Sequence, residues 1–67
     1  MADEKRQRRS LILKLVANEP IANQGHLLER LGKLGVETTQ ATISRDIRDL
    51  GLVKIADSSG VYRYVTR

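Results

Sequence analysis

Three residues that stop helices, Pro20, Gly35 and Gly51, divide this chain of 67 residues into four short segments. Proline disfavours helix in the residue before it, and glycine readily adopts the left-handed conformation that ends a helix. Each segment therefore has room for one helix or one hairpin. A domain of this size buries only roughly 60% of its unfolded surface, so it cannot enclose a large substrate. With no long linker and no repeat, the sequence predicts one small domain.

The first two segments predict amphipathic helices. A helix over residues 3–18 begins with Asp3 and Glu4, which suit the positive end of the helix dipole. Its apolar residues lie in two adjacent rows: Leu11, Ile12, Leu15 and Val16. A second helix over about residues 24–34 has Asn23 as its predicted N-cap and Gly35 as its left-handed cap. The leucines expected on its buried face are Leu27, Leu28, Leu31 and Leu34.

The third and fourth segments differ in period. Thr39 is the predicted cap of a third helix, in which apolar residues recur at i, i+4 and i+7: Ile43, Ile47 and Leu50. After Gly51, two runs rich in Val, Ile and Tyr flank Asp-Ser-Ser-Gly, which predicts a β-hairpin of Leu52–Ala56 and Val61–Val65. An isolated hairpin is marginal in water, so it must pack on the helices. The predicted fold class is α+β, mainly helical.

The second and third helices, joined by a short turn, have the proportions of a helix-turn-helix, whose second helix enters the major groove of DNA. At about 100° per residue, the third helix turns its three apolar residues inward. Its opposite face collects Ala41, Ser44, Arg45 and Arg48, and both acids of the helix fall outside that face. A carboxylate would repel phosphate, so this separation favours DNA binding. With the hairpin as a wing, the sequence predicts a winged helix-turn-helix.

Each side chain on this face suits a group on DNA. Arginine pairs bidentately with guanine, Ser44 suits a base edge or a phosphate, and Ala41 permits close approach to a thymine methyl. Gln40, at the start of the helix, suits adenine. The alternative interpretation is an ordinary solvated helix surface on which Arg45 and Asp49 pair at i, i+4.

Other cations allow two interpretations each. Lys54 and Arg63 lie on neighbouring strands, where they would reach phosphate or simply guard an exposed sheet edge. A basic cluster near the start of the first helix would touch phosphate or form a solvated face. Its members are Lys5, Arg6, Arg8 and Arg9.

The aromatic residues and the single histidine favour structural roles. Tyr62 and Tyr64 are expected to pack against Val53 and Ile55 rather than to stack on bases, which argues against recognition of single-stranded RNA. For His26, at the start of the second helix, a surface or capping role is expected rather than metal or proton chemistry.

Composition narrows the function further. Twelve Lys and Arg against eight Asp and Glu give a charge of +4, and the pI is near 10.0, which suits a polyanionic partner. The absence of Cys removes disulfides and thiolate zinc sites. We find no nucleophile–base pair, phosphate loop or metal-ligand cluster, and no apolar run approaching the roughly 20 residues that span a bilayer. We expect a cytoplasmic protein that is not an enzyme, has no metal and does not associate with membranes.

The run Thr39-Gln40-Ala41-Thr42-Ile43-Ser44-Arg45-Asp46-Ile47, followed by Leu52-Val53-Lys54 and Tyr62-Arg63-Tyr64, resembles the bacterial arginine repressor family. The resemblance implies a winged helix-turn-helix that binds double-stranded operator DNA through Ser44 and Arg45. It also implies repression of arginine biosynthesis genes, with activation of catabolic genes in some members. The candidate DNA-binding residues are Gln40, Ala41, Thr42, Ser44, Arg45, Arg48, Lys54 and Arg63.

Members of that family continue into a second domain that binds L-arginine and assembles trimers and hexamers. We therefore expect residues 1–67 to be the DNA-binding domain alone, either isolated from such a protein or a truncated relative whose regulation differs. It is expected to be a monomer without a cofactor, with L-arginine as co-repressor implied for the absent C-terminal domain. Two alternatives remain. One is the winged-helix domain of another metabolic regulator, such as a sugar-operon repressor, and the other is a protein–protein interaction module that docks through the first helix and Leu13.

Overall fold

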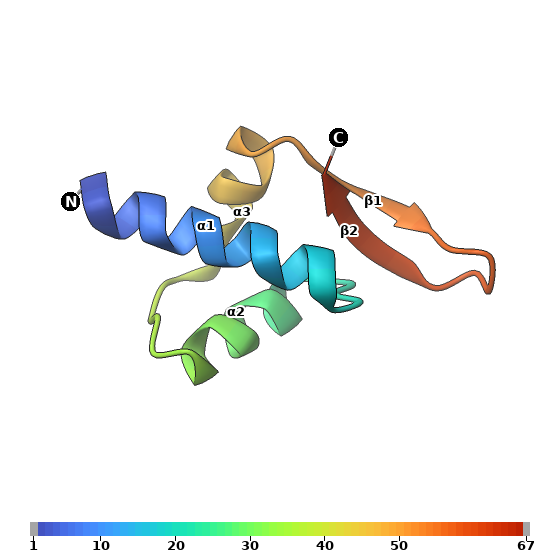
Figure 1. Ribbon diagram of the computed structural model, residues 1–67, viewed down its shortest axis with the longest axis horizontal. Helices are drawn as coiled ribbons and strands as arrows, with labels where there is room; N and C mark the ends of the chain where they lie inside the picture. Colours follow the sequence, from blue (N-terminus) through green and yellow to red (C-terminus); the bar gives the residue numbers. More distant parts are fainter. Residues whose placement is uncertain (1, 67) are drawn as a thin grey trace.

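The computed structural model describes residues 2–66 as three helices followed by a two-stranded antiparallel sheet (Figure 1). The elements are α1 (Ala2–Asn18), α2 (Gln24–Lys33), α3 (Gln40–Asp49), β1 (Leu52–Ala56) and β2 (Tyr62–Thr66). This order confirms the winged helix-turn-helix predicted from the sequence. The second strand begins and ends one residue later than the predicted Val61–Val65.

Both predicted N-caps are confirmed. Asn23 and Thr39 have extended backbone conformations, and each side chain accepts a hydrogen bond from the backbone N–H three residues later. The distances are 2.7 Å from His26 N to Asn23 Oδ1 and 3.3 Å from Thr42 N to Thr39 Oγ1. Each bond satisfies one of the N–H groups that the first turn of a helix leaves without a partner.

The turn between α2 and α3 depends on Gly35, which has a φ of 85°. Val36 N donates to Leu31 O at 2.9 Å and Gly35 N donates to Gly32 O at 3.1 Å, which is the pairing of a Schellman motif. Val36 then packs against the core. The chain therefore leaves α2 along a defined path, and this path sets where α3 begins.

One apolar core joins all five elements. Its fully buried side chains include Ile12 and Val16 of α1, Leu27 and Leu31 of α2, and Ile43 of α3. Sequence periodicity did not single out three further core residues: Ile21, Leu52 and Tyr64. The expectation that Leu34 shares the buried face of α2 is wrong, because it lies at the C-cap and is 50% exposed.

The hairpin packs on the helices along its inner end and projects away from them at its tip (Figure 1). Tyr64 N donates to Ile21 O at 2.9 Å, so β2 is tied to the segment between α1 and α2 as well as to β1. Strand pairing places Tyr64 opposite Lys54 and Tyr62 opposite Ala56. The predicted packing of the two tyrosines against Val53 and Ile55 is therefore wrong: Tyr64 enters the core and Tyr62 is 55% exposed.

Truncation at two leucines near the end of α2 tests this core. Leu31 is fully buried, whereas Leu34 is half exposed. We expect Leu31→Ala to lower the free energy of unfolding by about 2–5 kcal/mol, and Leu34→Ala to change it by no more than about 0.5 kcal/mol. Urea unfolding followed by circular dichroism measures both. Equal effects at the two positions would contradict the assigned core.

Candidate nucleic-acid interface

The outer face of α3 carries the side chains that the sequence predicts. Its exposed residues are Gln40, Ala41, Ser44, Arg45 and Arg48. On the inner side, Ile43 and Ile47 are buried, and Leu50, just after the helix, packs against the core while partly exposed. Thr42 is half-buried, and its Oγ1 lies 3.0 Å from Thr39 Oγ1 at the start of the helix.

Two arginines on this outer face are available for a partner. Within residues 2–66, no hydrogen bond or ion pair occupies the side chain of Arg45 or Arg48. The alternative that Arg45 is held by Asp49 across one turn is not realised, because Asp49 Oδ2 accepts instead from Arg9 Nη2 at 2.7 Å. The face therefore presents unpaired cations.

The acid nearest the middle of this helix, Asp46, points the other way and is 1% exposed. Its Oδ2 accepts from Arg8 Nε at 2.5 Å, and its Oδ1 accepts from Arg8 Nη2 and Arg9 Nε at 2.9 Å each. A buried carboxylate is strongly unfavourable unless it is paired and hydrogen-bonded. Both oxygens are satisfied here, so Asp46 is a link between α1 and α3.

The sequence pattern does not predict this link between α1 and α3. From the sequence, Arg8 and Arg9 could either contact phosphate or form a solvated face. In the structure, both guanidinium groups turn toward α3. Lys5 and Arg6, the other members of that cluster, are exposed. A usable signal was present: Asp46 lies about 60° from Ile43 around the helix, next to the apolar stripe. A carboxylate in that position needs a cationic partner from another element.

These bonds control the ionisation of Asp46. Burial raises the pKa of the carboxyl group, but the hydrogen bonds from Arg8 and then Arg9 more than offset this effect. The resulting pKa of Asp46 lies below its ordinary value of 3.8. Asp46 is therefore ionised at neutral pH and remains paired.

The wing carries two further candidate residues on opposite faces. Lys54 is exposed, and its Nζ lies 5.4 Å from the centroid of the Tyr64 ring. Arg63 is half-buried, and its Nη2 donates to Val16 O of α1 at 3.1 Å. The strand register separates them, because Lys54 pairs with Tyr64 and Arg63 pairs with Ile55. Within residues 2–66, the Lys54 ammonium group has no hydrogen-bond or ion-pair partner, whereas Arg63 is already bound to α1.

A second ion pair orients α2. Arg30 donates to both oxygens of Glu19, from Nε at 2.8 Å and from Nη2 at 2.9 Å. The bond from Arg30 lowers the pKa of Glu19. His26, expected to have a surface or capping role, is half-buried beside the Asn23 cap.

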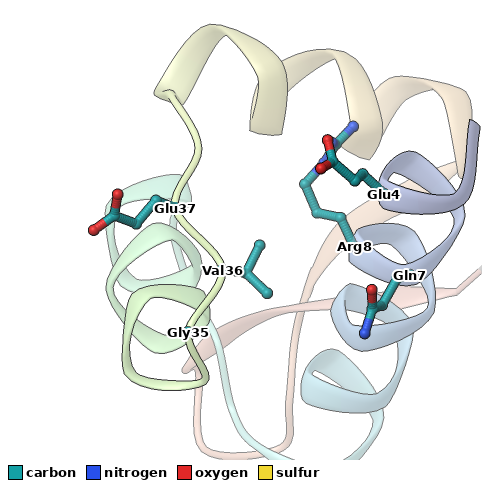
Figure 2. Close-up of a pocket in the computed structure, with 6 residues that line it drawn as sticks. All are labelled: Glu4, Gln7, Arg8, Gly35, Val36 and Glu37. Carbon is teal, nitrogen blue, oxygen red and sulfur yellow. The ribbon is translucent and has the colours of Figure 1, made fainter. Parts of the chain in front are cut away.

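A hollow of about 320 Å³ lies between the start of α1 and the turn after α2 (Figure 2). Its lining residues are Glu4, Gln7, Arg8, Gly35, Val36 and Glu37. Figure 2 shows the side chains of Glu4 and Arg8 close together on α1, with Glu37 turned away from them. Among residues 2–66, no group of three or more side chains is arranged to hold a metal ion. No helix in the same range has the length and apolar character needed to cross a membrane.

Comparison with known proteins decides the family. The family described as "Arginine repressor, DNA binding domain" matches residues 3–67. The chain belongs to this family. Its sequence is 52% identical over 60 residues to the arginine repressor of Moorella thermoacetica, covering 90% of this chain and 40% of that protein. It is 51% identical over 61 residues to the arginine repressor of Thermus thermophilus, covering 91% of this chain and 37% of that protein.

Membership of the arginine repressor family makes DNA the partner of this domain, and the family is one of transcription repressors rather than enzymes. The chain spans about two fifths of the length of the relatives it matches. Leu13, the proposed docking residue of the protein-binding alternative, packs against the domain's own core. Nothing in the structure or the comparisons favours that alternative.

Acid titration tests the Asp46 link. Because the folded-state pKa of Asp46 is lowered, its contribution to stability is present above the unfolded value near 3.8 and is lost as the pH falls through the folded value. We expect Asp46→Asn to be less stable than the parent by about 1–3 kcal/mol at neutral pH. That difference should shrink at pH 3 in urea unfolding, with exposed Glu37→Gln as control. A difference independent of pH would contradict the assignment.

Proposed function

We propose that this domain reads operator DNA for a repressor of arginine biosynthesis genes, with α3 seated in the major groove. The observation that carries the proposal is the acid-free outer face of α3, which presents the unpaired Arg45 and Arg48 beside the exposed Ser44. Ser44 and Arg45 are also the residues that the family resemblance assigns to DNA contact. Arginine suits guanine in the major groove, and serine suits either a base edge or a phosphate.

The remaining candidates take supporting roles in this proposal. Gln40 and Ala41, exposed in the first turn of α3, lie where a recognition helix meets base edges, whereas half-buried Thr42 supports the helix start. Lys54 on the wing approaches phosphate beside the groove. Arg63 has the weakest basis for DNA contact, because its guanidinium group is bound to the end of α1.

A single domain of this size makes few phosphate contacts, and non-specific binding of that kind has dissociation constants of roughly 10⁻⁴–10⁻⁶ M. We infer that the isolated domain acts as a monomer and that several copies on adjacent half-sites give useful operator affinity. The relatives are longer than this chain, and we propose that their remaining length assembles trimers and hexamers and binds L-arginine as co-repressor. The place of action is the bacterial cytoplasm, and the role requires no catalysis.

The reading role of Arg45 is tested with a duplex selected by the parent protein from a random 20-base-pair library. We expect Arg45→Ala to weaken binding to the selected duplex by about 1–3 kcal/mol, roughly 5- to 150-fold, and to relax selection at one base pair. Lys33→Ala, which removes an exposed positive charge from α2, is the matched control. Unchanged sequence preference after Arg45→Ala would remove this residue from the proposal.

Salt dependence tests the wing. Binding through phosphates releases counterions, so affinity must fall steeply as salt rises. We expect Lys54→Ala to reduce the slope of log affinity against log salt by about 1 while leaving sequence preference unchanged. Fluorescence anisotropy with a labelled duplex at several salt concentrations measures the slope. A parent protein with little salt dependence would favour the protein-binding alternative instead.

A further inference from the structure

We propose that Arg8 and Arg9 of α1 are positioning residues for DNA reading, which fix the orientation of α3 and neutralise its two acids. The proposal rests on the function proposed above, since it concerns how the outer face of α3 is presented to DNA. It goes beyond that function because neither arginine lies on α3 or on the wing, and neither is one of the predicted DNA-binding residues.

The geometry of the four side chains supports the first part of the proposal. Arg8 donates twice to Asp46, and Arg9 donates to Asp46 and to Asp49. Arg9 therefore bridges two carboxylates that lie three residues apart on α3, slightly less than one turn. The buried isoleucines hold α3 by apolar contact, which is non-directional, whereas hydrogen bonds weaken when their angles change. The ionic contacts are thus suited to fix the rotation of α3 about its own axis.

Electrostatics supports the second part of the proposal, that Arg8 and Arg9 neutralise the two acids of α3. Asp46 and Asp49 lie in the last turn of α3, where the helix dipole is negative and disfavours carboxylates. Asp46 is buried and fully paired, but the side chain of Asp49 is 43% exposed and is paired with Arg9. Without Arg9, a free carboxylate would stand one residue from Arg48, beside the face proposed to meet phosphate. Its charge would oppose the approach of DNA.

The alternative use of these two arginines is direct contact with phosphate. Their side chains are only 16% and 20% exposed, and Nε and Nη2 of each arginine already donate to the two carboxylates. A phosphate that took these donors would break the pairs and leave the buried Asp46 without them, which is costly. By contrast, Arg6, three residues before Arg9, is exposed and offers a direct comparison.

The test is a rescue experiment on the 67-residue domain. We expect Arg9→Gln to weaken binding to the selected duplex about fivefold or more, with a smaller effect on a random duplex. Adding Asp49→Asn to this variant should restore at least half of the loss on a logarithmic scale, because the unpaired charge is gone. Arg6→Gln removes the same charge from the exposed side of α1 and should leave the preference for the selected duplex unchanged.

The competing outcomes are distinct. If Arg9 contacts phosphate, Asp49→Asn will not restore binding, and Arg9→Gln will reduce the salt slope by about 1, which overturns the proposal. Unchanged affinity in a folded Arg9→Gln also overturns it.

Should Arg9→Gln fail to fold, Arg9→Lys keeps the charge but cannot reproduce the fork that reaches both carboxylates. Reduced preference for the selected duplex in Arg9→Lys then supports the proposal, and full preference overturns it. A parent domain that binds no duplex would instead defeat the proposed function itself.

Discussion

The paired burial of Asp46 is the constraint on which the arrangement of the domain depends. Apolar cores accept many combinations of side chains and small shifts of their helices, because apolar contact has little directional preference. Asp46 is 1% exposed, and a buried carboxylate does not tolerate shifts that separate it from its hydrogen-bond partners. Both oxygens of Asp46 find them on α1. The first half of α1 must therefore lie against the last turn of α3, and this contact directs the opposite face of α3 outward.

Local signals explain why so much of the fold could be predicted from the sequence. Asn23 and Thr39 cap helices through contacts within three residues, and Gly35 ends α2 through bonds to the preceding turn. Such features need no knowledge of the rest of the chain. The Arg8–Asp46 pair joins residues that are 38 positions apart, so no local pattern contains it. Helix periodicity placed Asp46 off the outer face correctly, but it could not name the partner that makes burial possible.

The hairpin shows a different limit of sequence reasoning. Alternation of apolar and polar residues predicts that the hairpin has two faces. The pairing register of the strands decides which residues share a face, and a shift of one residue moves every side chain of a strand to the other face. Here the register is set outside the strands. Asp57 Oδ1 accepts from Ser59 N and Val61 N and closes the turn, while Tyr64 N is tied to Ile21 O. These contacts put Tyr64 in the core, where its ring also lies near Lys54 Nζ. Composition alone could not assign that placement.

The distribution of charge matters more to this surface than the net charge of +4 does. Arg8 and Arg9 pair with the acids of α3, and Arg30 pairs with Glu19 beside α2. In each pair the positive charge of the arginine offsets the negative charge of the acid, so an approaching polyanion is repelled less by that acid. Arg45 and Arg48 remain unpaired on α3 among the described residues. The field at this face is therefore more positive than the overall composition implies, because the inward-facing arginines compensate the acids and leave the outward-facing ones unpaired.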